Sequence, residues 1–88
     1  MKRVKVFYLD KCKYCKNLMK ELDGLKIPYE SVDVNSVKGE KDFLNLYKLT
    51  KSDRIPTVIV GNQVLVPEIA FSDISTAIKI ITELYNKE

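Results

Sequence analysis

Hydrophobic residues change their spacing several times along this chain of 88 residues. Stretches dominated by β-branched and aromatic residues, or in which apolar and polar residues alternate, predict strands. Stretches in which apolar residues recur every three to four positions predict helices that face a core. The strands are predicted at residues 3–9, 29–34, 57–60 and 63–66, and the helices at residues 15–24, 40–51 and 74–85. The predicted order is therefore β-α-β-α-β-β-α.

Connections between these elements predict how the strands pair. A strand, a helix and a second strand form a parallel pair joined by a right-handed crossover. Gly61 and Asn62 tolerate a positive φ and predict a tight hairpin between the last two strands. Gly24 is placed to end the first helix, and Ser72 or Asp73 can cap the last one. The fold class is thus α/β, with a mixed four-stranded sheet flanked by three helices.

Composition excludes several kinds of protein. A chain of 88 residues has room for one domain, which we assign to residues 1–88. It has no histidine, which rules out Ser-His-Asp catalysis, Cys-His catalysis and His-ligated zinc. Its longest apolar runs, such as residues 55–60, are far shorter than the roughly 20 residues of a membrane span, and the N-terminus lacks the apolar stretch of a secretory signal. We expect a cytoplasmic monomer that binds no membrane.

Positive charge is concentrated in the first quarter of the chain. The net charge is +3 overall, with seven basic residues and one acidic residue among the first 20. Such a segment can bind nucleic acid, but the first basic residues alternate with apolar ones as in an ordinary strand, so we expect no nucleic-acid partner. Three of the lysines, Lys11, Lys13 and Lys16, surround the only two cysteines.

Cys12 and Cys15 lie where the first strand gives way to the first helix. Two intervening residues allow a disulfide to form with little backbone rearrangement, and a Cys-x-x-Cys motif in a β-α-β unit is typical of redox proteins. Cys12, at the helix N-terminus, is favoured as a thiolate by free backbone N–H groups and nearby lysines. Cys15, one turn later on the apolar face, is expected to be more buried and to have a higher pKa. We predict that Cys12 is the nucleophile and Cys15 the resolving thiol.

Other uses of the cysteine pair have less support. Zinc needs four ligands, so two cysteines without histidine could hold zinc, or an iron–sulfur cluster, only in a dimer. A structural disulfide would close a four-residue loop, which constrains the unfolded chain little, and such disulfides are uncommon in the cytosol. We expect no bound metal and no other bound cofactor.

A proline precedes the third strand in the segment Ile55-Pro56-Thr57. Proline cannot donate a hydrogen bond in a sheet, so at the entry to a buried strand it indicates a special turn, a cis peptide being one form. The alternative is that Pro56 simply ends a loop.

With these motifs the chain resembles the glutaredoxins, the small histidine-independent branch of the thioredoxin-fold thiol–disulfide oxidoreductases. The resemblance runs from the first strand through Cys-x-Tyr-Cys, a strand ending in Val-Asp-Val and x-Pro-x-Val-x-Val to the last helix. It implies a thioredoxin-like fold in which a cis Pro56 faces the cysteines, Ile55 pairs its backbone with the substrate, and Tyr14 flanks the bound thiol. It also implies that Ser72 and Asp73 hold the γ-glutamyl end of glutathione.

The chain departs from the family pattern at several positions. Lys13 replaces a proline that is usual in dithiol glutaredoxins, and residues 66–71 form a longer segment in place of a Gly-Gly pair. Leu9 stands where a lysine is common, and Lys11 or Lys51 is expected to replace that lysine. The positive charges expected near the cysteines and the proline come from Lys11, Lys13, Lys51 and Arg54.

The resemblance implies a thiol–disulfide oxidoreductase that reduces protein disulfides or glutathione mixed disulfides, with glutathione as co-substrate and a reductase as partner. The alternative is an electron donor for other proteins that does not use glutathione and is recharged by a flavoprotein of the thioredoxin-reductase type. A non-catalytic adaptor is disfavoured because both cysteines and the proline are present. The sequence leaves the first two possibilities open.

Overall fold

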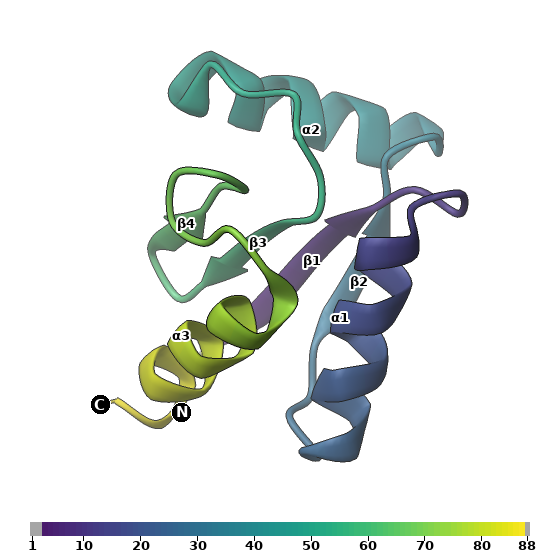
Figure 1. Ribbon diagram of the computed structural model, residues 1–88. Helices are drawn as coiled ribbons and strands as arrows, with labels where there is room; N and C mark the ends of the chain where they lie inside the picture. The colour runs from purple at the N-terminus through teal and green to yellow at the C-terminus, as the bar shows by residue number, and fades with distance from the viewer. Residues whose placement is uncertain (1–2, 88) are drawn as a thin grey trace.

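The computed structural model describes residues 3–87, and its elements follow the predicted order (Figure 1). The elements are β1 (Val4–Tyr8), α1 (Lys13–Gly24), β2 (Glu30–Asp33), α2 (Val37–Thr50), β3 (Thr57–Val60), β4 (Gln63–Leu65) and α3 (Ile74–Asn86). No helix within residues 3–87 has both the length and the apolar character needed to cross a membrane.

The four strands form one mixed sheet in the order β2-β1-β3-β4. β1 runs parallel to β2 and antiparallel to β3, so that Val6 lies opposite Val58 on β3. β3 and β4 form the antiparallel hairpin predicted from Gly61 and Asn62, with Val58 opposite Leu65. β1 is therefore an inner strand, and the chain leaves its end directly toward Cys12. The predicted mixed sheet is confirmed.

Two apolar clusters fix the helices on opposite faces of the sheet. The larger one joins β1 and β3 to α1 and α3, with Leu18 and Ile81 fully buried, and these two helices pack against each other. The smaller one joins the other face of the sheet to α2, where the rings of Phe7 and Phe43 lie 5.9 Å apart. Figure 1 accordingly shows α2 set apart from α1 and α3.

α2 begins at Val37, three residues before the predicted start at residue 40. Ser36 caps the helix, because its Oγ accepts the backbone N–H of Gly39 at 2.9 Å. Gly39 then packs against the carbonyl oxygen of Asp33 at the end of β2, where a Cβ atom would clash. The predicted helix excludes Gly39, which is instead the residue that lets α2 approach β2 closely.

α1 ends at Gly24 as predicted, but the residue that turns the chain is Lys26, with φ of 58°. The N–H of Lys26 donates to the carbonyl of Asp23 at 3.1 Å, and that of Ile27 to the carbonyl of Leu22 at 3.0 Å. These hydrogen bonds satisfy two carbonyl groups at the end of the helix. The chain turns here so that Ile27 is buried in the core.

Candidate active site

Cys12 is the N-cap residue of α1, with extended backbone angles (φ −86°, ψ 109°). The turn before it is closed by the N–H of Cys12, which donates to the carbonyl of Leu9 at 3.0 Å. Its Sγ accepts the backbone N–H of Cys15 at 3.2 Å and is partly exposed. The sulfur thus lies at the positive end of the helix dipole and receives a hydrogen bond from the first turn.

Cys15 lies one turn further along α1 and is fully buried. Burial above all, with the hydrogen bond with Cys12 and the charge of Cys12, raises the pKa of the Cys15 thiol to about 12. Cys15 therefore keeps its proton at neutral pH. Both cysteines are free thiols, and Cys15 is the more buried, as the sequence predicts.

The segment before β3 is held by one strong hydrogen bond. The Oγ1 of Thr57 is buried and donates to the carbonyl of Arg54 at 2.6 Å. Between them the Ile55–Pro56 peptide bond is cis, as the resemblance implies. Thr57 thus ties the loop that carries Ile55 and Pro56 to the start of a buried strand.

A cavity of about 390 Å³ brings together five of the residues that the sequence singles out. Tyr14 contributes from α1, Ile55 and Pro56 from the loop before β3, and Ser72 and Asp73 from the start of α3. These segments are far apart in the sequence, so the fold supplies the juxtaposition that the motifs alone do not. Neither cysteine lines the cavity, but Tyr14, which lies between them in the motif, does.

The lysines that the sequence offers do not line this cavity. Lys11 is exposed in the turn before Cys12, and Lys51 is the left-handed residue that ends α2. Of the four basic residues expected near the cysteines and the proline, only Arg54 is part of the cavity lining. A role of Lys11 in binding glutathione stays a prediction.

Glu68 is a cavity residue that the sequence did not identify. Its Oε1 lies 2.7 Å from Nη1 of Arg54, so an ion pair joins the segment after β4 to the loop before β3. Nothing in the local pattern pairs these two residues, which are 14 positions apart. The only signal was that residues 66–71 depart from the family pattern.

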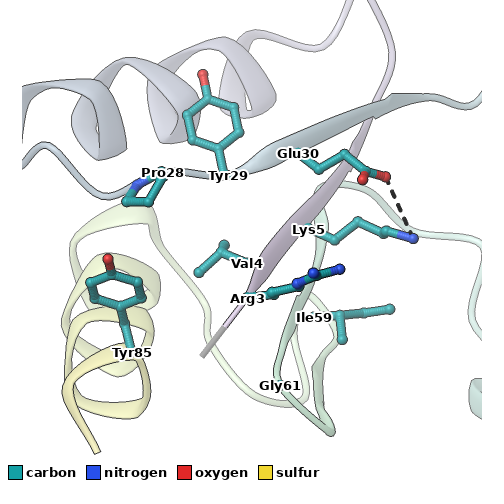
Figure 2. Close-up of a pocket in the computed structure, with 9 residues that line it drawn as sticks. All are labelled: Arg3, Val4, Lys5, Pro28, Tyr29, Glu30, Ile59, Gly61 and Tyr85. Carbon is teal, nitrogen blue, oxygen red and sulfur yellow. Dashed lines mark ion pairs between the residues drawn. The ribbon is translucent and has the colours of Figure 1, made fainter. Parts of the chain in front are cut away.

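A larger cavity of about 650 Å³ lies at the other end of the sheet, around the start of β1, and Cys12 follows the end of that strand (Figure 2). Figure 2 shows the rings of Tyr29 and Tyr85 on the side of the cavity where Pro28 lies. On the opposite side, Nζ of Lys5 lies 3.6 Å from Oε2 of Glu30 and forms an ion pair. Neither cysteine lines either cavity, but Tyr14, Ile55 and Pro56 line only the smaller one, so we assign the redox chemistry to the smaller cavity.

Within residues 3–87, no three Cys, Asp or Glu side chains lie close enough together to hold a metal ion.

Comparisons with solved structures give the same fold. The thioredoxin-like protein BC3987, solved as a mutant, superposes with a TM-score of 0.71 at 21% identity, over 96% of this chain and 100% of that one. A buckwheat glutaredoxin solved with glutathione gives a TM-score of 0.69 at 18% identity, over 96% of this chain and 72% of that one. The glutaredoxin of Archaeoglobus fulgidus gives 0.70 at 17% identity, over 99% and 89%.

No curated protein matches the chain in sequence. The sequence model of the glutaredoxin family, however, matches residues 4–65, from β1 through β4. That match contains both cysteines, the proline and all four strands, and it spans most of the chain. This chain belongs to the glutaredoxin family.

Proposed function

We propose that the protein is a thiol–disulfide oxidoreductase that reduces disulfides through Cys12 and Cys15. The observation that carries the proposal is the position of Cys12 Sγ at the start of α1, where it accepts the N–H of Cys15 at 3.2 Å. A thiolate, not a thiol, is the attacking species in disulfide exchange, and this position favours a thiolate.

In the first step the Cys12 thiolate attacks one sulfur of a substrate disulfide. A bond forms between Cys12 and that sulfur, the substrate S–S bond breaks, and the second substrate sulfur leaves as a thiolate that takes a proton from water. Lys11, Lys13 and Lys16 flank the cysteines in sequence and are exposed.

In the second step Cys15 loses its proton and attacks Cys12 Sγ. The bond between Cys12 and the substrate breaks, and the remaining substrate sulfur leaves and is protonated. Two electrons and two protons have then passed to the substrate, and the protein holds a Cys12–Cys15 disulfide.

The order of the two steps is supported by what raises the pKa of Cys15. Besides burial, the hydrogen bond with Cys12 and the charge of Cys12 contribute to the raised value. Both contributions disappear when Cys12 becomes part of a mixed disulfide, because its sulfur is then uncharged. Cys15 therefore becomes easier to ionise at the stage when it must attack.

The oxidised protein must be reduced again, either by two glutathione molecules or by the dithiol of a flavoprotein reductase. Regeneration of this kind needs a reducing compartment, so we propose that the protein acts in the cytoplasm. We also propose that it acts as a monomer.

The test compares Cys12→Ser and Cys15→Ser in the reduction of bis(2-hydroxyethyl) disulfide. Cys12→Ser is expected to abolish the reaction. Cys15→Ser is expected to complete the first step, to accumulate a Cys12 mixed disulfide visible by mass spectrometry, and to keep part of any glutathione-linked activity. Reduction by Cys12→Ser at the wild-type rate would disprove the assignment.

A further inference from the structure

The cavity lined by Tyr14, Ile55 and Pro56 carries a net negative charge. Three acidic residues and one basic residue line it, which gives a net charge of −2: Asp53, Glu68 and Asp73 against Arg54. The backbone N–H of Thr76 donates to Asp73, and this hydrogen bond lowers the pKa of the Asp73 carboxyl, which is therefore ionised at neutral pH. The rest of the lining is mostly apolar, with Ile55, Pro56, Pro67, Phe71 and Ile74.

The single positive side chain of the lining is already paired. Arg54 lies 2.7 Å from Glu68, and both side chains are more than half exposed. An exposed pair of this kind contributes little to stability, so a substrate can displace it. A substrate carboxylate that approaches Arg54 must nevertheless compete with a carboxylate that belongs to the chain itself.

Glu68 is held in this position by its loop. Its N–H donates to the carbonyl of Phe71 at 2.7 Å, and Phe71 is itself buried in the larger apolar cluster. The N–H of Ala70 donates to the carbonyl of Val66 at 2.9 Å. The loop that replaces the usual Gly-Gly pair thus presents Glu68 to Arg54 from an anchored backbone.

The start of α3 also carries an acidic side chain. A helix N-terminus attracts anions through its unpaired N–H groups. Here the Oδ1 of Asp73 accepts the N–H of Thr76 at 2.7 Å, so that the chain places its own carboxylate at this end of the helix. An acidic side chain of the protein therefore lies at each feature that could bind an anionic substrate.

Building on the proposed function, we infer that the cavity selects a disulfide carried by a polypeptide segment with basic residues beside its cysteine, and that Glu68 determines this specificity. The apolar lining suits an extended peptide, and the acidic groups around it attract lysine or arginine side chains. Glutathione, with two carboxylates and one ammonium group, is a poor match to the same lining. Its predicted partners Ser72 and Asp73 share this lining with Asp53 and Glu68, whose charges repel its two carboxylates.

The experiment uses three blocked tripeptides as symmetric disulfides, with cysteine flanked on both sides by lysine, glutamine or glutamate. Fully reduced protein is mixed with each disulfide, quenched with acid at intervals, and the released thiol is measured by chromatography. This single turnover needs no reductase. Each rate constant is divided by that of dithiothreitol with the same disulfide, which removes differences in the reactivity of the peptides themselves.

The wild-type protein is expected to reduce the lysine-flanked disulfide about tenfold faster than the glutamate-flanked one at low salt, and the ratio should fall to about twofold at about 0.3 M salt. Glu68→Gln should lower the low-salt ratio about threefold, and Arg54→Gln should raise it, because the two substitutions change the cavity charge in opposite directions. Glu83→Gln removes the same charge from an exposed site near the far end of α3 and should leave the ratio unchanged.

Equal normalised rates for the three disulfides in the wild-type protein would overturn this inference, as would equal shifts of the ratio by Glu68→Gln and Glu83→Gln. Neither result would affect the proposed function, which would instead fail in this experiment if the reduced protein did not react with the glutamine-flanked disulfide. The ratio of rates thus tests the charge selection, and the reaction with the glutamine-flanked disulfide tests the chemistry of Cys12.

Discussion

The backbone N–H of Cys15 donates to Sγ of Cys12 at 3.2 Å, so that the residue carrying the buried thiol also stabilises the exposed sulfur. This hydrogen bond joins two thiols with opposite environments, since Cys12 lies partly exposed at the helix start and Cys15 is fully buried. The difference between them is the basis of the first two predictions.

Alkylation of the reduced protein is expected to modify Cys12 at least about tenfold faster than Cys15 near pH 7, because Cys15 is both protonated and inaccessible. Limiting iodoacetamide followed by peptide mass spectrometry measures the two rates. In urea, where the helix is lost, the rates should become similar. Equal rates in the folded protein would contradict the assigned roles.

Stability should depend on pH through Cys15. The folded-state pKa of Cys15 is about 12 against an ordinary value of 9.0, so above about pH 9 the unfolded chain loses a proton that the folded chain keeps. Unfolding is then favoured, and the contribution of the buried thiol to stability falls as the pH rises from about 9 toward 12. Between about pH 8.5 and about pH 10.5 the expected loss is about 1–2 kcal/mol.

The comparison of Cys12→Ser with Cys12→Ser/Cys15→Ala isolates this effect, because neither variant can form the internal disulfide and the other titrating groups are shared. Burial, the largest cause of the raised pKa, is retained in the single variant. Urea unfolding at several pH values gives the difference in unfolding free energy. A difference that does not change with pH would show that Cys15 is not desolvated.

Gly39→Ala should destabilise the protein by about 1–3 kcal/mol, because the added Cβ would clash with the carbonyl oxygen of Asp33 and lie 2.6 Å from Ser36 Oγ. Gly24→Ala is the matched control, since a Cβ there meets nothing within 4 Å and alanine favours a helix. Urea unfolding should show no loss for the control. Equal stability of the two variants would refute the close approach of α2 to β2.

Thr57→Val should cost about 1–2 kcal/mol and also slow the single-turnover reaction, because it leaves the Arg54 carbonyl without the hydroxyl that ties the Ile55–Pro56 loop to β3. Thr57→Ser retains the hydroxyl and should recover most of the reaction rate. If both variants react as slowly as each other, the methyl group of Thr57, and not the hydrogen bond, positions the loop.

Elements of this fold could be predicted because their signals are local. The alternation of residues in β1 and the spacing of Leu18 and Leu22 in α1 are visible without any knowledge of distant neighbours. The start of α2 was placed too late because Gly39 usually indicates a linker, whereas its presence here is explained by the contact with Asp33.

The site was predictable to the extent that its residues belong to motifs. Cys12, Cys15 and Pro56 follow from their own sequence motifs, and Tyr14 and Ile55 from the resemblance. The structure gathers Tyr14, Ile55 and Pro56 around one cavity. The charge of the cavity did not follow, because proximity in sequence says little about which way a side chain faces. Lys11 adjoins Cys12 without lining the cavity. Glu68 lines the cavity from residues 66–71, a segment that is longer than in the family pattern.

Because Cys15 occupies a fully buried position in α1, folding and electron transfer in this protein share one thermodynamic cycle. A substitution that stabilises the reduced and oxidised forms unequally must shift the equilibrium of thiol–disulfide exchange with a partner. The shift in free energy equals the difference between the two stabilisations. Packing positions such as Leu18, one turn beyond Cys15 and equally buried, are therefore expected to adjust the strength of the protein as a reductant without contacting any substrate. Substitutions in the hydrophobic interior can therefore change the reduction potential of the cysteine pair as much as substitutions in the exposed cavity.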